Sequence, residues 1–403
     1  MSEQSPRRQR LVVALVALLV TATATVAGVR AASPPKSGTP HTTWAAPQAP
    51  PPTAGRLAFG VSYGDTLLFD NDHNLAQGLD DAVALGVRWI RLDLSWEDIQ
   101  PDTPTGYQWN RFDRVVNAAR ARGLNLLPTI AYTPSWARSS GCRAGQSCPP
   151  ANPETFADFA AQAVERYSPK GITTWEIWNE PNIKPFWEPK PDPAAYTRLL
   201  AVTTKAIRHV NPRAYLLMGG LAAVGTDKST GYVSQTAFLA AVSELGANKM
   251  VDAISYHPYT YPYLPTDDTT FGTAFQRIST YTSDNLVAIL EKYGTPREPV
   301  WITETGAPTN GPGAAADGKT IPPNATDVTE AFQAQIATAS VTAAANNPHV
   351  AAMFWFADRD SGTAADRAFR SKFYGLRHNN GTAKPAFAAL QSAIAEYERT
   401  RHG

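Results

Sequence analysis

The chain has 403 residues, of which 43% are hydrophobic and 18% are charged, so it can bury the core of one large domain or two ordinary ones. Its formal net charge is +1, which gives neither the basic excess that nucleic-acid-binding proteins use nor an acidic tail. We therefore expect no nucleic-acid partner.

The beginning of the chain has the composition of an export signal. A basic stretch over residues 1–10 precedes a long apolar run, Leu11–Val29, and small residues offer a cleavage point near Ala31 or Ala32. The run is nineteen residues long, so an uncleaved membrane anchor is the alternative. We favour a cleaved signal peptide over residues 1–32, and both interpretations place the protein outside the cell or at the cell envelope.

Residues 33–54 follow with seven prolines and almost no large apolar side chains. Such a segment cannot bury a core, so we expect an extended, disordered linker. The folded domain is expected to begin at Gly55 and to continue to residue 403.

Eight short apolar runs follow, and helical stretches separate them. The runs cover residues 57–63, 87–94, 124–132, 173–179, 214–220, 251–259, 299–305 and 350–357. One intervening segment shows a clear helical stripe from Phe156 to Tyr167, with Pro153 at its start. Continuous apolar runs that alternate with helices indicate a parallel sheet covered by helices.

Eight such units, with no Gly-rich nucleotide-binding motif after the first run, predict an α/β fold, a closed (β/α)8 or TIM barrel. A doubly wound open sheet is the alternative. In the closed barrel the carboxyl ends of the strands form the active face. Glu180 comes directly after the fourth run and Glu304 lies at the end of the seventh, so the two carboxylates would face each other across one rim.

Two facing carboxyl groups are the minimum machinery for cleaving a glycosidic bond. One must be protonated to assist the leaving oxygen, and the other must attack the sugar or activate water. Crowding of like charges raises one of the two pKa values and so separates the two roles.

The stretches WEIWNEPN, at residues 175–182, and WITETGAP, at residues 301–308, resemble the two catalytic signatures of clan A retaining glycoside hydrolases. The resemblance covers the chain from about Gly55 to its end. The sequence is similar to both family 5 and family 39 of that clan. It implies a barrel in which Glu180 is the acid/base and Glu304 is the nucleophile.

The same resemblance implies roles for further residues. Asn179 matches the residue that hydrogen-bonds the sugar 2-hydroxyl, and Arg91 matches the strand-two arginine that holds the nucleophile ionised. His257 and Tyr259 match the strand-six pair beside the nucleophile. Trp355 matches the strand-eight tryptophan that forms the floor of the sugar site.

Two departures from the family patterns stand out. Many family 5 members have a histidine after strand three, where this chain has Tyr132 and Trp136; this pattern lies closer to family 39. That family often carries an additional β-sandwich, and this chain ends after the eighth helix. Trp136 falls in a loop on the active face, where an exposed aromatic ring would stack on a sugar, although core packing explains it equally well.

Glu176 lies further back in its strand than Glu180. A buried carboxylate needs a partner, so we interpret Glu176 as a structural residue paired with Arg91 or Arg88.

Cys142 and Cys148 lie in one loop rich in glycine, serine and proline. In an exported protein this arrangement predicts a short disulfide. A metal-binding pair is the weaker alternative, because no histidine or further cysteine lies near them in the sequence.

These observations predict an exported, monomeric retaining glycosidase that hydrolyses the O-glycosidic bonds of an oligo- or polysaccharide by double displacement. No metal or organic cofactor is expected. A transglycosylase on the same scaffold and a non-catalytic carbohydrate-binding barrel are the alternatives. If the segment 11–29 is retained, it would attach the protein to a membrane.

Overall fold

The computed structural model describes residues 50–401, except for residues 144, 270, 271 and 283. The predicted signal or anchor, and the predicted linker apart from its last five residues, lie outside the described part. No helix within the described residues is both long enough and apolar enough to cross a membrane.

Strands and helices alternate along the described chain. The strands are β1 (Ala58–Ser62), β2 (Trp89–Ser95), β3 (Asn125–Ala131), β4 (Thr174–Asn179), β5 (Tyr215–Ala222), β6 (Ala253–His257), β7 (Val300–Thr305) and β8 (Val350–Phe356). The helices are α1 (Thr66–Phe69), α2 (Asp72–Ala84), α3 (Trp96–Ile99), α4 (Asn110–Ala121), α5 (Pro153–Tyr167), α6 (Pro193–Val210), α7 (Gln235–Glu244), α8 (Gln276–Ser279), α9 (Leu286–Lys292), α10 (Glu330–Ala345) and α11 (Pro385–Arg401).

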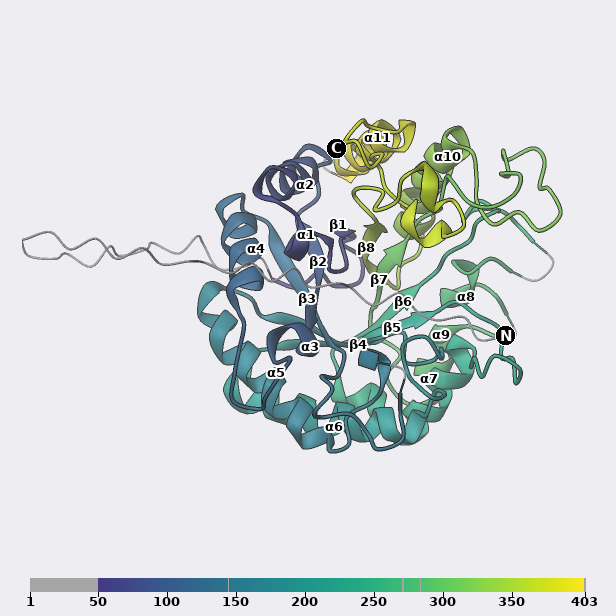
Figure 1. Cartoon of the computed structure of the whole chain (residues 1–403). Helices are drawn as coiled ribbons and strands as arrows, with labels where there is room; N and C mark the ends of the chain where they lie inside the picture. The colour runs from purple at the N-terminus through teal and green to yellow at the C-terminus, as the bar shows by residue number, and fades with distance from the viewer. Residues whose placement is uncertain (1–49, 144, 270–271, 283, 402–403) are drawn as a thin grey trace, which may run out of the picture. The chain divides into compact units, whose positions relative to one another are not determined.

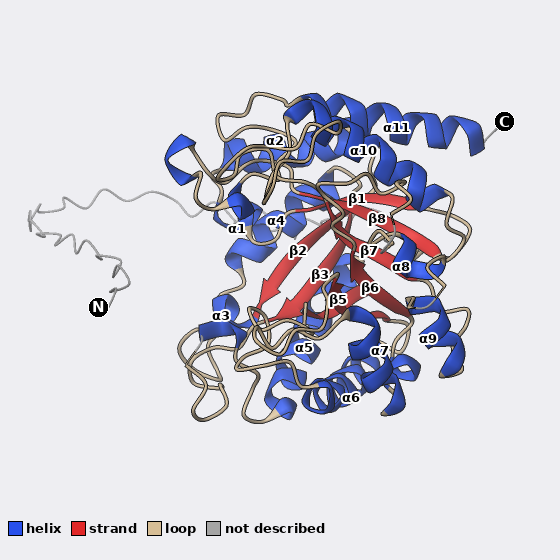
Figure 2. Ribbon diagram, turned by 90° about the vertical axis from the view of Figure 1, so that its right-hand side faces the viewer, coloured by secondary structure: helices blue, strands red, loops and turns tan. Residues whose placement is uncertain are grey.

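The strands form a closed parallel barrel in the order β1 to β8, and β8 pairs with β1. Figure 1 shows the strands in sequence around the barrel with the longer helices outside them, and Figure 2 shows the same arrangement from the side. The predicted (β/α)8 fold is therefore confirmed, and the open-sheet alternative is wrong.

Local sequence explains where the helices begin. Asn152 caps α5 by accepting a hydrogen bond from the Glu154 backbone, and Pro153 occupies the first turn, where no backbone N–H is needed. The apolar stripe predicted for this helix is buried from Phe156 to Tyr167. Burying that stripe against the strands holds the helix on the barrel, because a helix of this length is marginal by itself.

Inside the barrel, the alternation of side chains along each strand separates an apolar layer from a polar one. Trp89, Leu127 and Trp301 belong to a hydrophobic cluster distinct from the larger core between strands and helices. Two residues further along β2 and β7, the same face carries Arg91 and Thr303. The apolar layer therefore lies beneath a polar layer at the carboxyl ends of the strands.

Candidate active site

Glu180 and Glu304 lie together at the carboxyl end of the barrel. His257 bridges them: its Nδ1 atom is 2.8 Å from Glu180 Oε1 and 3.7 Å from Glu304 Oε2. One carboxylate oxygen from each glutamate and one histidine nitrogen all lie within 4.8 Å of one another. A retaining pair of carboxyl groups is separated by about 5 to 5.5 Å, whereas an inverting pair stands further apart. The observed geometry has the short spacing.

Arg91, on β2, joins the residues of this site. Its side chain has no exposed surface, and its NH1 donates to Glu304 Oε1 at 2.6 Å. Its NH2 donates to Asn179 Oδ1 at 2.8 Å. Because Arg91 occupies the amide oxygen, the Asn179 Nδ2 group is the part of that side chain left to donate to a ligand.

Glu176 pairs with Arg91, as the sequence predicted. The Arg91 Nε atom donates to Glu176 Oε2 at 2.5 Å, and both side chains are fully buried. Thr129 donates to the same oxygen at 2.7 Å, and Thr303 donates to the other oxygen at 2.9 Å. Both carboxylate oxygens of Glu176 thus accept hydrogen bonds, which offsets the cost of burying the charge.

The surroundings move the pKa values of the two glutamates apart. Burial raises the pKa of Glu180. Burial also acts to raise the pKa of Glu304, but His257 and Arg91 and the hydrogen bond from Tyr259 hold it below its ordinary value. Glu180 is therefore suited to carry a proton and Glu304 to remain ionised, which are the two states that a retaining mechanism needs.

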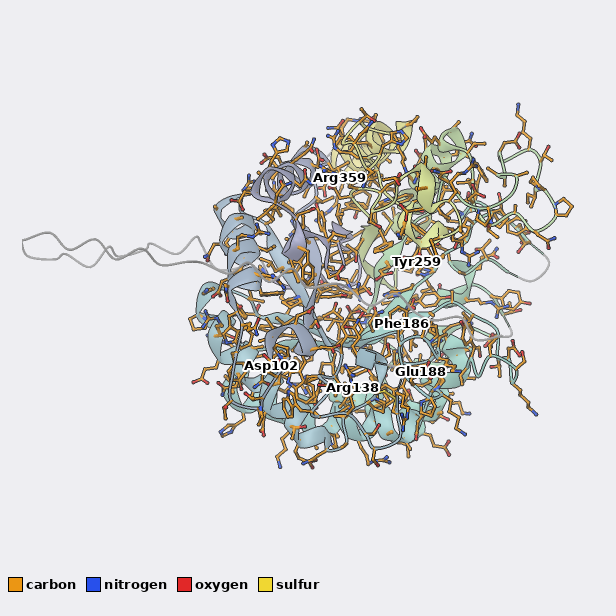
Figure 3. All side chains as sticks on the ribbon, in the orientation of Figure 1. Asp102, Arg138, Phe186, Glu188, Tyr259 and Arg359 are labelled. Atoms are coloured by element: carbon orange, nitrogen blue, oxygen red, sulfur yellow. A yellow bond between two sulfur atoms is a disulfide. The ribbon has the colours of Figure 1, made fainter. Side chains whose placement is uncertain are left out.

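Tyr259 follows β6, and Figure 3 labels it among the side chains of the barrel. Its hydroxyl donates to Glu304 Oε2 at 2.7 Å. Together with the bond from Arg91, this fixes both oxygens of Glu304 in place. A nucleophile that cannot rotate is already oriented for attack.

Three residues at this end of the barrel have left-handed backbone conformations, which residues other than glycine rarely adopt. They are Tyr132 with φ of 69°, Trp178 with φ of 73° and Glu180 with φ of 42°. Such conformations cost on the order of 1–3 kcal/mol each, and the surrounding structure must hold them. Their concentration next to the two glutamates agrees with a functional site.

The prediction for Trp355 is wrong in this structure. Trp355 has no exposed surface and belongs to the core between strands and helices. Side chains alternate along β8, so Phe354 faces the barrel interior and Phe356 is the next residue on that face. Phe356 is half-buried and packs edge-on against Tyr374. The aromatic residue at the mouth is therefore one position later than predicted.

Trp136 lies in the loop after β3 and is half-buried. Its indole N–H donates to the Gln100 carbonyl at 2.8 Å, and its ring packs edge-on against Trp96. This packing gives the ring a structural role, and stacking on a sugar stays a prediction.

Asp93 lies within β2, two residues after Arg91 and on the same face. Its carboxylate accepts a hydrogen bond from the Tyr132 hydroxyl at 3.3 Å. Burial raises the pKa of Asp93 to about 7. The two-residue alternation from Arg91 was the signal that could have found it.

Glu180, His257 and Glu304 also form a group whose geometry could hold a metal ion. Arg91 lies against Glu304, so a positive charge already occupies the edge of that position. This arrangement disfavours a divalent cation and favours use of the carboxylates as proton and nucleophile groups.

Cys142 and Cys148 form the predicted disulfide, with their Cα atoms 5.8 Å apart. The closed loop is tied to its surroundings by backbone hydrogen bonds from Thr133 to Gln146 and from Glu188 to Ser147. The loops after β3 and β4 are thereby joined.

Comparison with solved structures gives the same fold. A family 39 glycoside hydrolase from Bacteroides cellulosilyticus matches with a TM-score of 0.63 and 22% identity, over 84% of this chain and 64% of that one. A family 39 β-xylosidase from Caulobacter crescentus matches with a TM-score of 0.60 and 20% identity, over 86% and 73%. A family 5 enzyme from Streptomyces cattleya in complex with GlcNAc matches with a TM-score of 0.59 and 18% identity, over 86% and 81%.

The chain spans less than two thirds of the length of the Bacteroides protein. A family model decides the membership more directly, because the cellulase model, glycosyl hydrolase family 5, matches residues 56–360. That range contains all eight strands of the barrel and both glutamates. With the two carboxylates and the closed barrel in place, the chain belongs to the cellulase family of glycosyl hydrolases, family 5, and is a glycoside hydrolase.

Proposed function

We propose that this protein is an exported retaining glycosidase that hydrolyses a β-linked oligo- or polysaccharide, with Glu304 as nucleophile and Glu180 as acid/base. The observation that carries the proposal is the pair of carboxyl groups within 4.8 Å whose pKa values are moved in opposite directions. A pair this close has room for direct attack on the sugar.

In the first step a Glu304 oxygen attacks the anomeric carbon as the bond to the leaving oxygen breaks. Glu180 transfers its proton to that oxygen, and a covalent glycosyl-enzyme forms. In the second step Glu180, now ionised, takes a proton from water while the water oxygen displaces Glu304. Two displacements at one carbon restore the original anomeric configuration.

The neighbouring residues support these steps. Arg91 and Tyr259 hold Glu304 ionised and oriented. The Asn179 amide N–H group, left free by the bond from Arg91, is proposed to donate to the sugar hydroxyl next to the anomeric carbon, and a hydrogen bond there that strengthens in the transition state accelerates cleavage.

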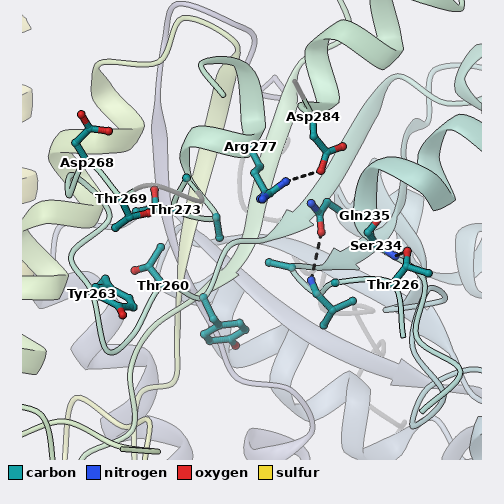
Figure 4. Close-up of a pocket in the computed structure, with 16 residues that line it drawn as sticks. Thr226, Ser234, Gln235, Thr260, Tyr263, Asp268, Thr269, Thr273, Arg277 and Asp284 are labelled. Atoms are coloured by element: carbon teal, nitrogen blue, oxygen red, sulfur yellow. Dashed lines mark hydrogen bonds and ion pairs between the residues drawn. The ribbon is translucent and has the colours of Figure 1, made fainter. Parts of the chain in front are cut away.

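A cleft of about 780 Å³ next to the glutamates supports a substrate of more than one sugar unit. We call it the β5–β6 cleft, because the loops after those strands line it, and Figure 4 shows its side chains. Tyr259 lines this cleft and also donates to Glu304. The cleft therefore borders Glu304 through Tyr259.

The lining of the β5–β6 cleft suits a neutral, hydroxyl-rich ligand. It carries the hydroxyl groups of Thr226, Ser234, Thr260, Tyr263, Thr269 and Thr273. Its arginine, Arg277, is paired with Asp284, so no unbalanced positive charge is offered to an anionic ligand. Gln235 is buried; its Oε1 accepts from the Val224 backbone, which leaves the Nε2 amide to donate into the cleft.

Substitution in this cleft tests the length of the substrate. Gln235→Leu should raise KM for an oligosaccharide substrate several-fold, because one donor to the second sugar is lost. The kcat/KM for an aryl glycoside with the same first sugar should stay unchanged, because that leaving group does not reach the cleft. Equal losses on both substrates would remove the assignment of this cleft to the substrate.

For the substrate we propose only a class of compound, the β-glycosides. Solved relatives of the fold include a β-xylosidase and an exo-β-1,4-mannosidase, so β-xylosides and β-mannosides belong in the first screen beside β-glucosides. Transglycosylation uses the same glycosyl-enzyme with a sugar hydroxyl in place of water, and product analysis with an added acceptor sugar separates the two reactions. Export rests on the sequence of residues 1–32.

The mechanism is tested with Glu180→Ala. Cleavage of substrates with poor leaving groups should fall by about 10²–10⁴-fold, because they need a proton in the transition state. Activated aryl glycosides should react in the first step and then stall, and added azide should release a glycosyl azide of retained configuration. Proton NMR of the first wild-type product provides the decisive measurement, since an inverted anomer would refute double displacement.

A further inference from the structure

We propose that Thr303 and Glu176 are positioning residues that fix the tautomer of His257 and thereby keep the catalytic proton on Glu180. This inference rests on the proposed role of Glu180 as acid/base. It concerns two fully buried side chains that touch neither the substrate position nor the reacting atoms.

The direction of each hydrogen bond begins at Glu176. Its carboxylate is ion-paired with Arg91 and can only accept. The Thr303 hydroxyl lies 2.9 Å from Glu176 Oε1, so its single hydrogen is donated there. Thr303 therefore has only lone pairs to offer to any other neighbour.

That other neighbour is His257. Its Nε2 atom is 3.0 Å from the Thr303 oxygen, and since this oxygen can only accept, Nε2 must carry a hydrogen. A neutral imidazole has one N–H, so the Nδ1 atom of neutral His257 carries a lone pair. The buried bond to Thr303 selects this tautomer.

The tautomer decides where the next proton lies. Nδ1 is 2.8 Å from Glu180 Oε1. A lone pair facing an ionised carboxylate is repulsive, so this contact is favourable only while one proton lies between Glu180 and His257. In the opposite tautomer, neutral His257 would donate from Nδ1 to ionised Glu180, which would lower the pKa of the acid.

Residues on β7, β2 and β5 surround the His257 ring in this orientation. Glu304, on β7, lies 3.7 Å from Nδ1, and Arg91, on β2, lies beyond Glu304. On β5 the neighbour is Gly220, where a Cβ atom would lie only 2.1 Å from Nε2. The absence of a side chain at Gly220 therefore gives the ring its place, and β5 offers it no competing charge.

The pKa shifts agree with a proton shared by the pair. Burial acts to lower the pKa of His257, but the two glutamates raise it above its ordinary value. Burial raises the pKa of Glu180. Both groups thus hold on to protons, as expected where one proton joins them.

The tautomer can be measured without any assay of activity. In nitrogen-15 NMR of the wild-type protein, the His257 signals are identified by their loss in His257→Gln. We expect Nε2 to be protonated at every pH at which the protein is folded. A neutral ring with its proton on Nδ1 and a bare Nε2 would overturn the proposal, whether or not the protein proves to be a glycosidase.

The consequence for catalysis is measured with Thr303→Val and Thr303→Ser. Valine removes the acceptor and lets His257 take the other tautomer, so the basic limb of kcat/KM should move to lower pH by about one to two units. Serine keeps the hydroxyl and should keep the limb in place. A folded valine variant with an unmoved basic limb would contradict the proposal.

Thr129→Val is the matched control. Thr129 is equally buried and also donates to Glu176, but it makes no bond to His257. It should lower stability as Thr303→Val does and leave the basic limb where it is. An equal shift in this variant would show that loss of any bond to Glu176 moves the limb, which would overturn the specific role of Thr303.

Discussion

At the carboxyl end of the barrel, Arg91, Glu176 and Glu304 lie in one connected set of hydrogen bonds, whereas at the amino end the described residues place a buried carboxyl group, Glu298, without an ion pair. Just before β7, neither carboxyl oxygen of Glu298 makes a hydrogen bond within the described residues, nor does the indole N–H of Trp301. At the first end the charges are paired, while at the second burial favours the uncharged form of Glu298.

The comparison shows that the energetically unfavourable features of this fold include backbone strain at the carboxyl end of the barrel. The carboxyl end also contains the left-handed backbone of Trp178 and Glu180, which disfavours the folded state locally. The apolar layer beneath it, with Trp89 and Trp301 packed edge-on, supplies stability without any charge. A reactive, strained end on a well-packed base is the general arrangement of barrel enzymes.

The largest effect is expected from Glu304→Gln. Turnover of an activated aryl glycoside should fall by a factor on the order of 10⁴ or more, because no other group can attack the anomeric carbon. Thermal unfolding should be little changed, since the glutamine oxygen can still accept from Arg91 and the amide N–H can donate to the Tyr259 hydroxyl oxygen. Retention of a tenth or more of the wild-type rate would exclude Glu304 as the nucleophile.

Arg91→Met tests whether the charge set stabilises the carboxyl end. Removal of one partner leaves Glu176 buried without its counter-ion, so the free energy of unfolding should fall by about 3–5 kcal/mol. The pKa of Glu304 should also rise, which moves the acidic limb of kcat/KM upward, because a positive charge that favoured ionisation is gone.

The exposed Arg88, just before β2, provides the control for Arg91. Arg88→Met should change the free energy of unfolding by no more than about 0.5 kcal/mol. Chemical denaturation of both variants gives the comparison, and equal losses would mean that the charge set at the carboxyl end has no special weight.

Glu298→Gln should have the smallest effect and the opposite sign. Burial raises the pKa of Glu298 to about 8. The folded state therefore binds this proton more tightly than the unfolded state, and wild-type stability should fall as the pH rises from the unfolded pKa of about 4.5 toward 8. The glutamine variant lacks that loss, so at about pH 8 it should be more stable by on the order of 1 kcal/mol.

Melting curves over this pH range test the Glu298 prediction, with Glu291→Gln, an exposed position on α9, as the control. The advantage of Glu298→Gln should disappear as the pH falls below about 4.5, where the wild-type carboxyl becomes protonated in the unfolded state as well. A variant that is less stable than wild type at high pH would mean that Glu298 has a partner, and the contrast between the two ends would fail.

Much of the site could be predicted because its signals are local. The strand-end positions of Glu180 and Glu304 follow from apolar runs that stop at them, and parallel strands in a closed barrel bring such ends to one rim. The pairing of Glu176 with Arg91 followed from the rule that a buried carboxylate needs a partner.

Other features could not be predicted because they depend on exact register. Trp355 and Phe356 are adjacent aromatic residues, and a shift of one position along β8 decides which one faces the mouth.

The sequence by itself determined the order of strands and helices, the barrel class and the two glutamates, because periodicity and strand-end motifs are properties of short segments. The tertiary structure alone decided the distances between the carboxyl groups, the opposite shifts of their pKa values and the bonds that join Thr303 to His257. Those properties arise between strands far apart in the chain, and burial and neighbouring charge act only once the barrel has closed.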